Sequence, residues 1–288
     1  MNILPQVLIN GILIGSFYSL VAMGLNIIFG VMKVVNFCQG ELLMIGMYSS
    51  YFLVTTFGMD PYLTLVIVVI LMFIIGGLIQ FGLITPTLSK DGSGSSQIFL
   101  TVGLALLFQN IALLSFSANY RTIKINYSQT NFNLFGQIIS LPKFISFMVL
   151  LIISFLLFFF LSKTDLGKKI RATSQNPLGA RLAGINDKEI YIVTYGIGAA
   201  LAGIAGALLL PFYYVFPLVG DIFTLRAFVV VVLGGLGSIK GAFFGGIILG
   251  LLETIGAIIV GPSYKDSIVF ITFIVILIFR EVFQSREG

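Results

Sequence analysis

The chain has 288 residues, of which 58% are hydrophobic and only 9% are charged. Soluble domains carry roughly 25% charged residues, so this composition excludes a water-soluble enzyme, a nucleic-acid-binding module and a disordered chain. It predicts an all-α integral membrane protein, because helices satisfy all their backbone hydrogen bonds inside a bilayer.

Missing residue types exclude several kinds of chemistry. The sequence contains no histidine and a single cysteine, Cys38. These counts exclude an imidazole metal site, histidine acid–base catalysis, an intrachain disulfide and a cysteine cluster for zinc or iron–sulfur. A GxxxxGK[ST] phosphate loop is also lacking, so any ATP hydrolysis is expected on a separate chain.

Stretches without charged side chains predict the membrane spans, because a charge in hydrocarbon costs roughly 2.5–3.5 kcal/mol and a span needs roughly 20 apolar residues. The first stretch covers residues 1–32. It is interpreted as a span rather than a cleaved signal peptide, since no basic segment precedes its apolar part. Four more predicted spans follow, at 42–58, 62–84, 98–116 and 144–161.

The C-terminal part contains further charge-poor stretches, at 190–210, 222–233, 242–260 and 268–279. Glycine-rich residues 234–241 interrupt this series, and a second interruption precedes the span at 42–58. Each interruption is either a full turn or a re-entrant break. The sequence therefore predicts eight to ten transmembrane or re-entrant helices in a single transmembrane domain over residues 1–288.

Basic residues are concentrated in the loop 163–189. Its lysine and arginine residues are Lys163, Lys168, Lys169, Arg171, Arg181 and Lys188. Positive charge gathers in cytoplasmic loops, so this loop is predicted to be cytoplasmic and the polar loop 119–143 external. With nine spans, the N-terminus lies outside.

Small residues one helical turn apart, such as Gly11 with Gly15 and Ala202 with Gly206, predict close helix packing. The glycine ladder over 234–250 is denser than packing needs. It predicts a broken or moving helix beside a pathway, since irregular backbone in a membrane must lie in protein or face water.

Polar, charged and glycine residues within the spans are candidates for lining a solute pathway, since an intramembrane ionisable group is a functional-site hypothesis. For Glu253 both a conduit or gating role and a structural ion pair remain open. Arg226, Lys33 and Lys240 are predicted to reach the membrane surface instead. The candidate pathway residues are Asn10, Ser16, Tyr18, Asn36, Glu41, Gly237, Gly241 and Glu253.

The cytoplasmic loop 163–189 contains a predicted short helix. Asn176 and Pro177 are typical of a helix start, Gly184 of a helix end and Asn186 of the cap of the next helix. Such a helix either docks into a groove of a partner or simply connects two spans, and both alternatives remain open.

Three blocks of the sequence carry a family resemblance. They are residues 10–30 with 34–42, the run Ala180-Arg181-Leu182-Ala183-Gly184-Ile185-Asn186 followed by 199–208, and residues 234–238 with 241–253. Together they resemble the LivH-type permease of branched-chain amino acid ABC importers over nearly the whole chain. The general importer EAA loop is matched only in part, because Leu178 and Gly179 replace its Glu and Ala.

The resemblance implies the permease architecture of an ABC importer that moves amino acids by alternating access across the cytoplasmic (inner) membrane of a bacterium or archaeon. It implies a second homologous permease subunit, two cytoplasmic ABC ATPases and an external substrate-binding protein as partners, in a lipid bilayer and without nucleic acid. ATP would be used by the partner subunits, and this chain would bind neither a cofactor nor a metal and would not be an enzyme.

The same resemblance implies that the short cytoplasmic helix couples the permease to its ATPases. Because the loop is short, rich in small residues and predicted to be cytoplasmic, Ala180 and Gly184 are predicted to lie in a tight socket on an ATPase. The residues of this predicted ATPase-coupling loop are Asn176, Pro177, Gly179, Ala180, Ala183, Gly184, Ile185 and Asn186.

Other functions remain open at this point. A stand-alone secondary transporter or channel for a small solute fits the same composition, and ABC permeases of similar architecture move urea or sugars. An intramembrane enzyme is disfavoured, since the chain lacks paired acids or a histidine-assisted nucleophile.

Overall fold

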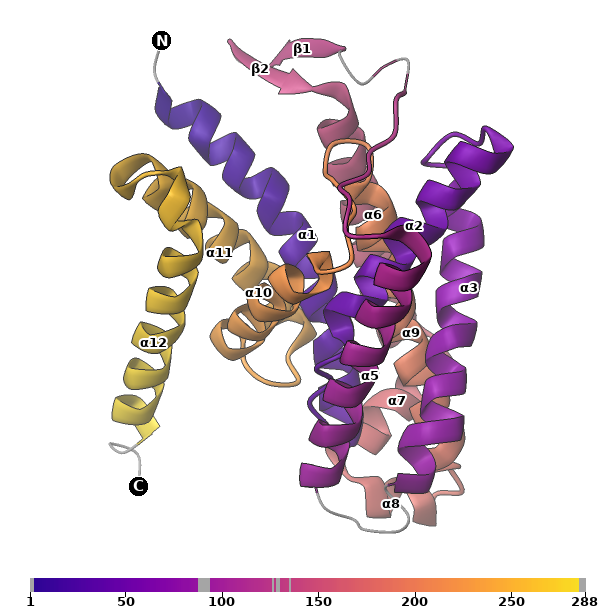
Figure 1. Ribbon diagram of the computed structural model, residues 1–288. Helices are drawn as coiled ribbons and strands as arrows, with labels where there is room; N and C mark the ends of the chain where they lie inside the picture. The colour runs from indigo at the N-terminus through magenta and orange to yellow at the C-terminus, as the bar shows by residue number, and fades with distance from the viewer. Residues whose placement is uncertain (1–2, 88–93, 126, 128–129, 135, 285–288) are drawn as a thin grey trace.

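The computed structural model describes residues 3–87, 94–125, 127, 130–134 and 136–284. Long α-helices and one short β-hairpin make up the described fold (Figure 1), in agreement with the predicted all-α membrane class. The start of α1 (Ile3–Met32) lies near the hairpin at the upper end of Figure 1, and α8 (Pro177–Leu182) lies at the lower end. By the orientation predicted from the basic loop, the upper end is external and the lower end is cytoplasmic.

The first half of the chain forms three helices after α1. They are α2 (Gln39–Phe57), α3 (Thr64–Ile79) and α5 (Gly94–Phe116), and a π-helical turn, η1 (Gln80–Ile84), continues α3. The predicted interruption between the first two spans is confirmed, because α1 stops at Met32 and the next helix begins at Gln39.

The prediction that residues 119–143 form a polar loop is wrong in part. β1 (Asn131–Leu134) and β2 (Gln137–Ser140) pair antiparallel within it, with Asn131 opposite Ser140 and Leu134 opposite Gln137. Gly136 supplies the positive φ of 77° in the connecting turn. Because each strand has only four residues, hydrophobic alternation gives little signal for it in the sequence.

The second half of the chain contains the remaining long helices. They are α6 (Leu141–Lys163), α9 (Asp187–Leu209), α10 (Val219–Gly234), α11 (Ile239–Val260) and α12 (Lys265–Gln284), with a 3₁₀ turn, η2 (Pro262–Tyr264), before the last. Each helix begins three residues before its predicted span, as at residue 141 instead of 144. A helix can begin in polar or charged residues outside the hydrocarbon. The charge-free stretch that predicts a span excludes those residues, so it begins later than the helix.

Within the described residues, six helices are long and apolar enough to cross a membrane. They are Leu4–Met32, Thr64–Thr87, Ser95–Phe116, Leu141–Lys163, Asp187–Leu209 and Ile239–Val260. Helix α10 has only 16 residues, fewer than the roughly 20 of a full crossing. The range of eight to ten transmembrane or re-entrant helices therefore stays a prediction.

Close backbone contact holds the centre of the bundle together. Helix α1 packs against α11 and α9, and α9 also packs against α2 and α3. A Cβ atom built on Gly15 would lie 2.7 Å from the Gly246 carbonyl oxygen, and one on Gly206 would lie 2.2 Å from the Leu43 carbonyl oxygen. The close packing predicted for these small residues is therefore confirmed, and larger side chains there would separate the helices.

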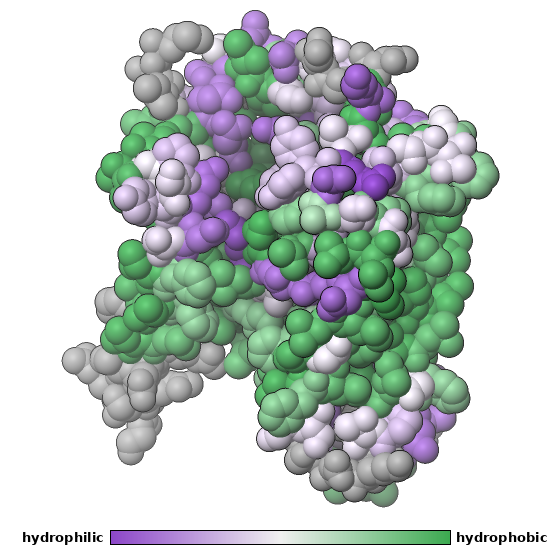
Figure 2. Space-filling model, viewed as in Figure 1, coloured by the Kyte–Doolittle hydropathy of each residue, from purple (hydrophilic) through white to green (hydrophobic). Residues whose placement is uncertain are grey.

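The outer helices expose apolar side chains, as a lipid-facing surface requires. Exposed examples are Phe99 and Leu114 of α5 and Phe155 of α6. Figure 2 shows a broad hydrophobic area across the middle of the molecule, with hydrophilic residues gathered towards the upper end, the lower end and a hollow in the upper half.

Candidate functional site

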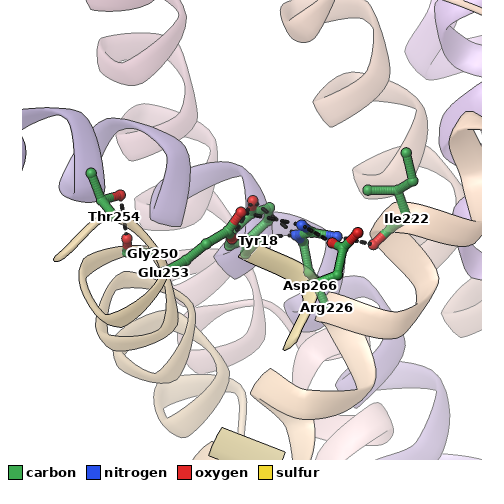
Figure 3. A network of polar contacts seen from close by, with 7 residues as sticks. All are labelled: Tyr18, Ile222, Arg226, Gly250, Glu253, Thr254 and Asp266. Carbon is green, nitrogen blue, oxygen red and sulfur yellow. Dashed lines mark hydrogen bonds and ion pairs between the residues drawn. The ribbon is translucent and has the colours of Figure 1, made fainter. Parts of the chain in front are cut away.

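Four side chains from four helices meet in a charged cluster (Figure 3): Tyr18 of α1, Arg226 of α10, Glu253 of α11 and Asp266 of α12. The Arg226 guanidinium donates to both Glu253 carboxylate oxygens, at 3.1 and 3.3 Å, and to Asp266 Oδ1 at 2.8 Å. The Tyr18 hydroxyl donates to Glu253 Oε2 at 2.8 Å and accepts from Arg226 Nε at 3.0 Å. The cluster therefore ties the four helices together.

The prediction that Arg226 reaches the membrane surface is wrong. Arg226 is 5% exposed and Glu253 6%, so both charges are buried and pair with each other. A buried charge is tolerated only when it is paired and hydrogen-bonded, and the Ile222 carbonyl accepts a further Arg226 N–H. The sequence alone does not reveal this ion pair, because Arg226 and Glu253 lie 27 positions apart on different helices.

A cavity of about 410 Å³ opens beside the cluster. We call it the ion-pair cavity. It brings together three of the predicted pathway residues, Asn10, Tyr18 and Glu253, with Arg226. Aromatic and aliphatic side chains, among them Phe212, form most of the remaining wall, and the other lining residues are Lys143, Thr254 and Lys265. Small-solute sites have this size and this combination of an apolar wall with a few convergent polar groups.

Ser16 lies outside that cavity. Its hydroxyl donates to the Leu13 carbonyl oxygen of its own helix at 2.7 Å, and its side chain is buried. This local bond is typical of a serine within a helix. A contact of Ser16 with a solute stays a prediction.

Asn36 and Glu41 belong to a second polar region at the start of α2. The Asn36 side-chain amide donates to Gln39, whose own amide donates to the Gly198 carbonyl oxygen of α9. The Gln109 amide donates both to Glu41 Oε1, at 3.0 Å, and to Asp221 Oδ1, at 2.7 Å.

Glu41 is fully buried, and its second oxygen, Oε2, has no hydrogen-bond partner among the described residues. The sequence analysis missed Asp221 of α10. Asp221 lies near Glu41 of α2 only in the folded chain, where both carboxylates accept from the Gln109 amide of α5.

The predicted break in the glycine ladder is a turn at residues 235–238, between α10 and α11. Gly235 and Gly237 adopt positive φ values of 92° and 83°, which only glycine adopts without strain. The Asn26 side chain holds this turn, because its amide donates to the Gly235 and Ser238 carbonyl oxygens and its oxygen accepts from Gly237 N–H. We call residues 235–238 the glycine turn.

Gly241 lies within α11 instead of in the turn. A Cβ atom on it would lie 1.7 Å from the Gly234 carbonyl oxygen, so α10 and α11 touch here through their backbones. The roles of Gly237 and Gly241 in a pathway stay predictions.

Replacing Gly241 with alanine is therefore expected to lower the thermal stability of the protein, since overpacking costs typically 1–3 kcal/mol. The matched control is Gly103→Ala in α5, where an added Cβ meets no atom within 4 Å. Thermal unfolding of both variants in detergent checks this. Equal melting temperatures would contradict the backbone contact.

The basic loop folds into two helices, α7 (Asp165–Gln175) and α8. We call them the coupling segment after their predicted role, which stays a prediction. The sequence predicted α8 but missed α7, because α7 is a short helix with a charged face and lies outside the apolar spans. The predicted cap is confirmed: Asn176 Oδ1 accepts from Gly179 N–H at 2.9 Å, and Pro177 opens the helix. Asn186 likewise caps α9 by accepting from Lys188 N–H.

Ala180 is buried inside this chain, so its side chain does not face outward as the socket prediction requires. Leu178 and Leu182 of the same helix face outward, at 67% and 83% exposure. Gly184 and Ala183 are also exposed, Gly179 and Ile185 are half-buried, and Gly184 has a positive φ of 79°. An added Cβ at Gly184 meets nothing within 4 Å, so this position requires glycine for its conformation rather than for space.

Two exposed ion pairs stabilise the ends of the coupling segment only slightly. The hydrogen bond from Lys168 holds the pKa of Asp165 below its usual range, which keeps a negative charge at the start of α7. Arg181 of α8 pairs with Asp187 at the start of α9.

Comparison with known proteins decides the family. The model of the branched-chain amino acid transport system permease component matches residues 7–277. The chain belongs to this family. It is therefore a multi-pass membrane permease, and its closely packed apolar helices agree with that assignment.

Two relatives align with almost the whole permease. The high-affinity branched-chain amino acid transport system permease protein BraD of Pseudomonas aeruginosa is 31% identical over 286 residues, 96% of this chain and 93% of the relative. LivH of Escherichia coli K12, with the same description, is 30% identical over 290 residues, 95% of this chain and 92% of the relative. The ribose import permease protein RbsC of Escherichia coli matches only 38% of the chain. No solved structure matches the permease.

Proposed function

We propose that the permease moves branched-chain amino acids into the cytoplasm as a membrane-spanning subunit of an ABC importer. The observation that carries the proposal is the nearly full-length similarity to permeases described for branched-chain amino acid transport. The permease sits in the cytoplasmic membrane of a bacterium or archaeon, with the coupling segment inside.

The ion-pair cavity suits a branched-chain amino acid as a passing solute. A zwitterion with an apolar side chain needs one positive group, one negative group and an apolar wall. Arg226 and Lys265 supply positive charge, Glu253 supplies negative charge, and Phe212 and Tyr213 supply aromatic surface. Because Arg226 and Glu253 already satisfy each other, the cavity offers a weak and transient contact, as a conduit requires.

Four further chains complete the importer: a second, homologous permease, two cytoplasmic ATPases and an external substrate-binding protein. The permease itself binds no cofactor or metal, and the ATPases bind and hydrolyse ATP. Closure of the ATPases moves the coupling segment, and the helices around the cavity then open alternately to the two sides.

The coupling segment has a direct mechanical connection to the bundle. Ser174 of α7 donates to the Gly30 carbonyl oxygen of α1 at 2.7 Å. Four residues earlier in α1, Asn26 holds the glycine turn at the start of α11. Force on α7 therefore reaches α1 and the glycine turn through two adjacent hydrogen-bonded contacts.

Reconstitution tests the proposal. The permease, its partner permease, the ATPases and the binding protein are assembled in liposomes, and uptake of leucine, isoleucine, valine, ribose and urea is measured with and without ATP. We expect ATP-dependent uptake of the three amino acids only. Equal uptake by the permease alone without ATP would support a secondary transporter or channel, and uptake of ribose or urea would support a different ABC substrate.

A further inference from the structure

A second cavity, of about 340 Å³, lies at the cytoplasmic end of the bundle. It is enclosed by the last turns of α1 and α6, by α7, and by the glycine turn with the start of α11. We call it the basic cavity. It shares no lining residue with the ion-pair cavity.

The polar side of the basic cavity carries uncompensated positive charge. Arg171 of α7 and Lys240 of α11 line it, and no aspartate or glutamate does. Neither side chain forms an ion pair within the part of the chain that the structure describes. The Arg171 guanidinium donates to the Ser162 carbonyl oxygen at a long distance, 3.5 Å.

The start of α11 adds to this positive charge. The partial positive charge of a helix N-terminus favours an anion, and Ser238 caps this end by accepting from Gly241 N–H. Arg171, Lys240 and the helix start thus point to an anionic ligand with phosphate-like chemistry.

The lining of the basic cavity also has an apolar part. Ile27 and Val31 of α1 and Phe158 and Leu161 of α6 form it. These residues lie in two helices that are long and apolar enough to cross a membrane, and α6 also exposes Phe155 and Phe159. Burial of an acyl chain against this apolar surface stabilises a bound lipid, whereas a free phosphate ion has no apolar surface to bury.

We propose that the basic cavity binds an anionic phospholipid of the cytoplasmic leaflet, with its phosphate group between Arg171 and Lys240 and an acyl chain along α6. Basic pockets between membrane helices on the cytoplasmic side have this chemistry. The bound headgroup bridges α7 and the start of α11, and it therefore steadies the coupling segment against the bundle.

Lipid binding to the intact, delipidated complex tests this proposal. Native mass spectrometry and thermal unfolding are recorded with phosphatidylglycerol, phosphatidylcholine or inorganic phosphate. We expect retained phosphatidylglycerol and a raised melting temperature with that lipid only. In the double variant Arg171→Gln/Lys240→Gln, affinity for phosphatidylglycerol should fall about 30-fold, because each basic side chain near an anionic surface contributes about five-fold.

The matched control is Lys169→Gln/Lys188→Gln, which removes two exposed charges from the same side of the molecule but outside the cavity. It should bind phosphatidylglycerol like the wild type. Equal binding of phosphatidylcholine, equal protection by inorganic phosphate, or unchanged affinity in the Arg171/Lys240 variant would each overturn the proposal. Dissociation of the permease pair in that variant would assign the basic cavity to a protein interface instead.

Discussion

Replacing Arg226 with glutamine is expected to remove most of the folded permease from the membrane. The substitution leaves the buried Glu253 carboxylate without its cation, and breaking one partner of a buried ion pair costs about 3–5 kcal/mol. Size-exclusion chromatography of the detergent-extracted protein and its melting temperature measure the loss. The control is Lys168→Gln, which breaks an exposed pair with Asp165 and should cost less than about 1 kcal/mol.

The double variant Arg226→Leu/Glu253→Leu separates a structural role from a transport role. Apolar replacement of both partners of a buried pair is often neutral for folding, and Asp266 is not left as a buried charge because its side chain is 73% exposed. We expect assembly to recover while amino acid uptake stays at least ten-fold below the wild type. Recovery of both would show that the ion pair only holds the helices together, and wild-type stability of Arg226→Gln alone would contradict the buried pair itself.

Replacing Leu182 with aspartate is expected to abolish ATP-driven uptake without unfolding the permease. Leu182 is the most exposed apolar side chain of α8, so the substitution disturbs no packing within this chain. In an apolar groove of an ATPase, the aspartate would have to lose its water, which costs several kcal/mol. We expect at least a ten-fold loss of both uptake and the ATP hydrolysis that the loaded binding protein stimulates.

The matched control for Leu182 is methionine, which keeps the volume and apolar character of the side chain. Leu182→Met should retain uptake, and both variants should be extracted in wild-type amounts. Normal coupling in the aspartate variant would place the ATPase contact elsewhere on the coupling segment.

The sequence predicted the helices well because their signal is local. A charge-free stretch shows where the chain enters hydrocarbon, and Asn176 and Asn186 are recognised as caps from two or three neighbouring residues. The small-residue pairs were informative for the same reason, since only close packing of backbones requires Gly15 and Gly206.

The features that the sequence did not reveal either depend on distant partners or lack a local signal. Arg226 was assigned to the membrane surface because its partner, Glu253, lies on another helix. Ala180 was assigned to an outer socket because small size does not show which face of α8 is turned inward. Helix α7 was not predicted because a charged surface helix of 11 residues has a composition similar to that of a loop.

Helix α1 runs without interruption from Tyr18, in the charged cluster, through Asn26 to Gly30, which accepts from the coupling segment. The 12 residues from Tyr18 to Gly30 span roughly 18 Å at a rise of about 1.5 Å per residue. An unbroken helix resists compression, so a displacement of its cytoplasmic end along the axis shifts the Tyr18 hydroxyl by the same amount. Because α1 also packs backbone to backbone against α11, which carries Glu253, such a displacement moves Tyr18 and Glu253 together relative to the helices outside this pair.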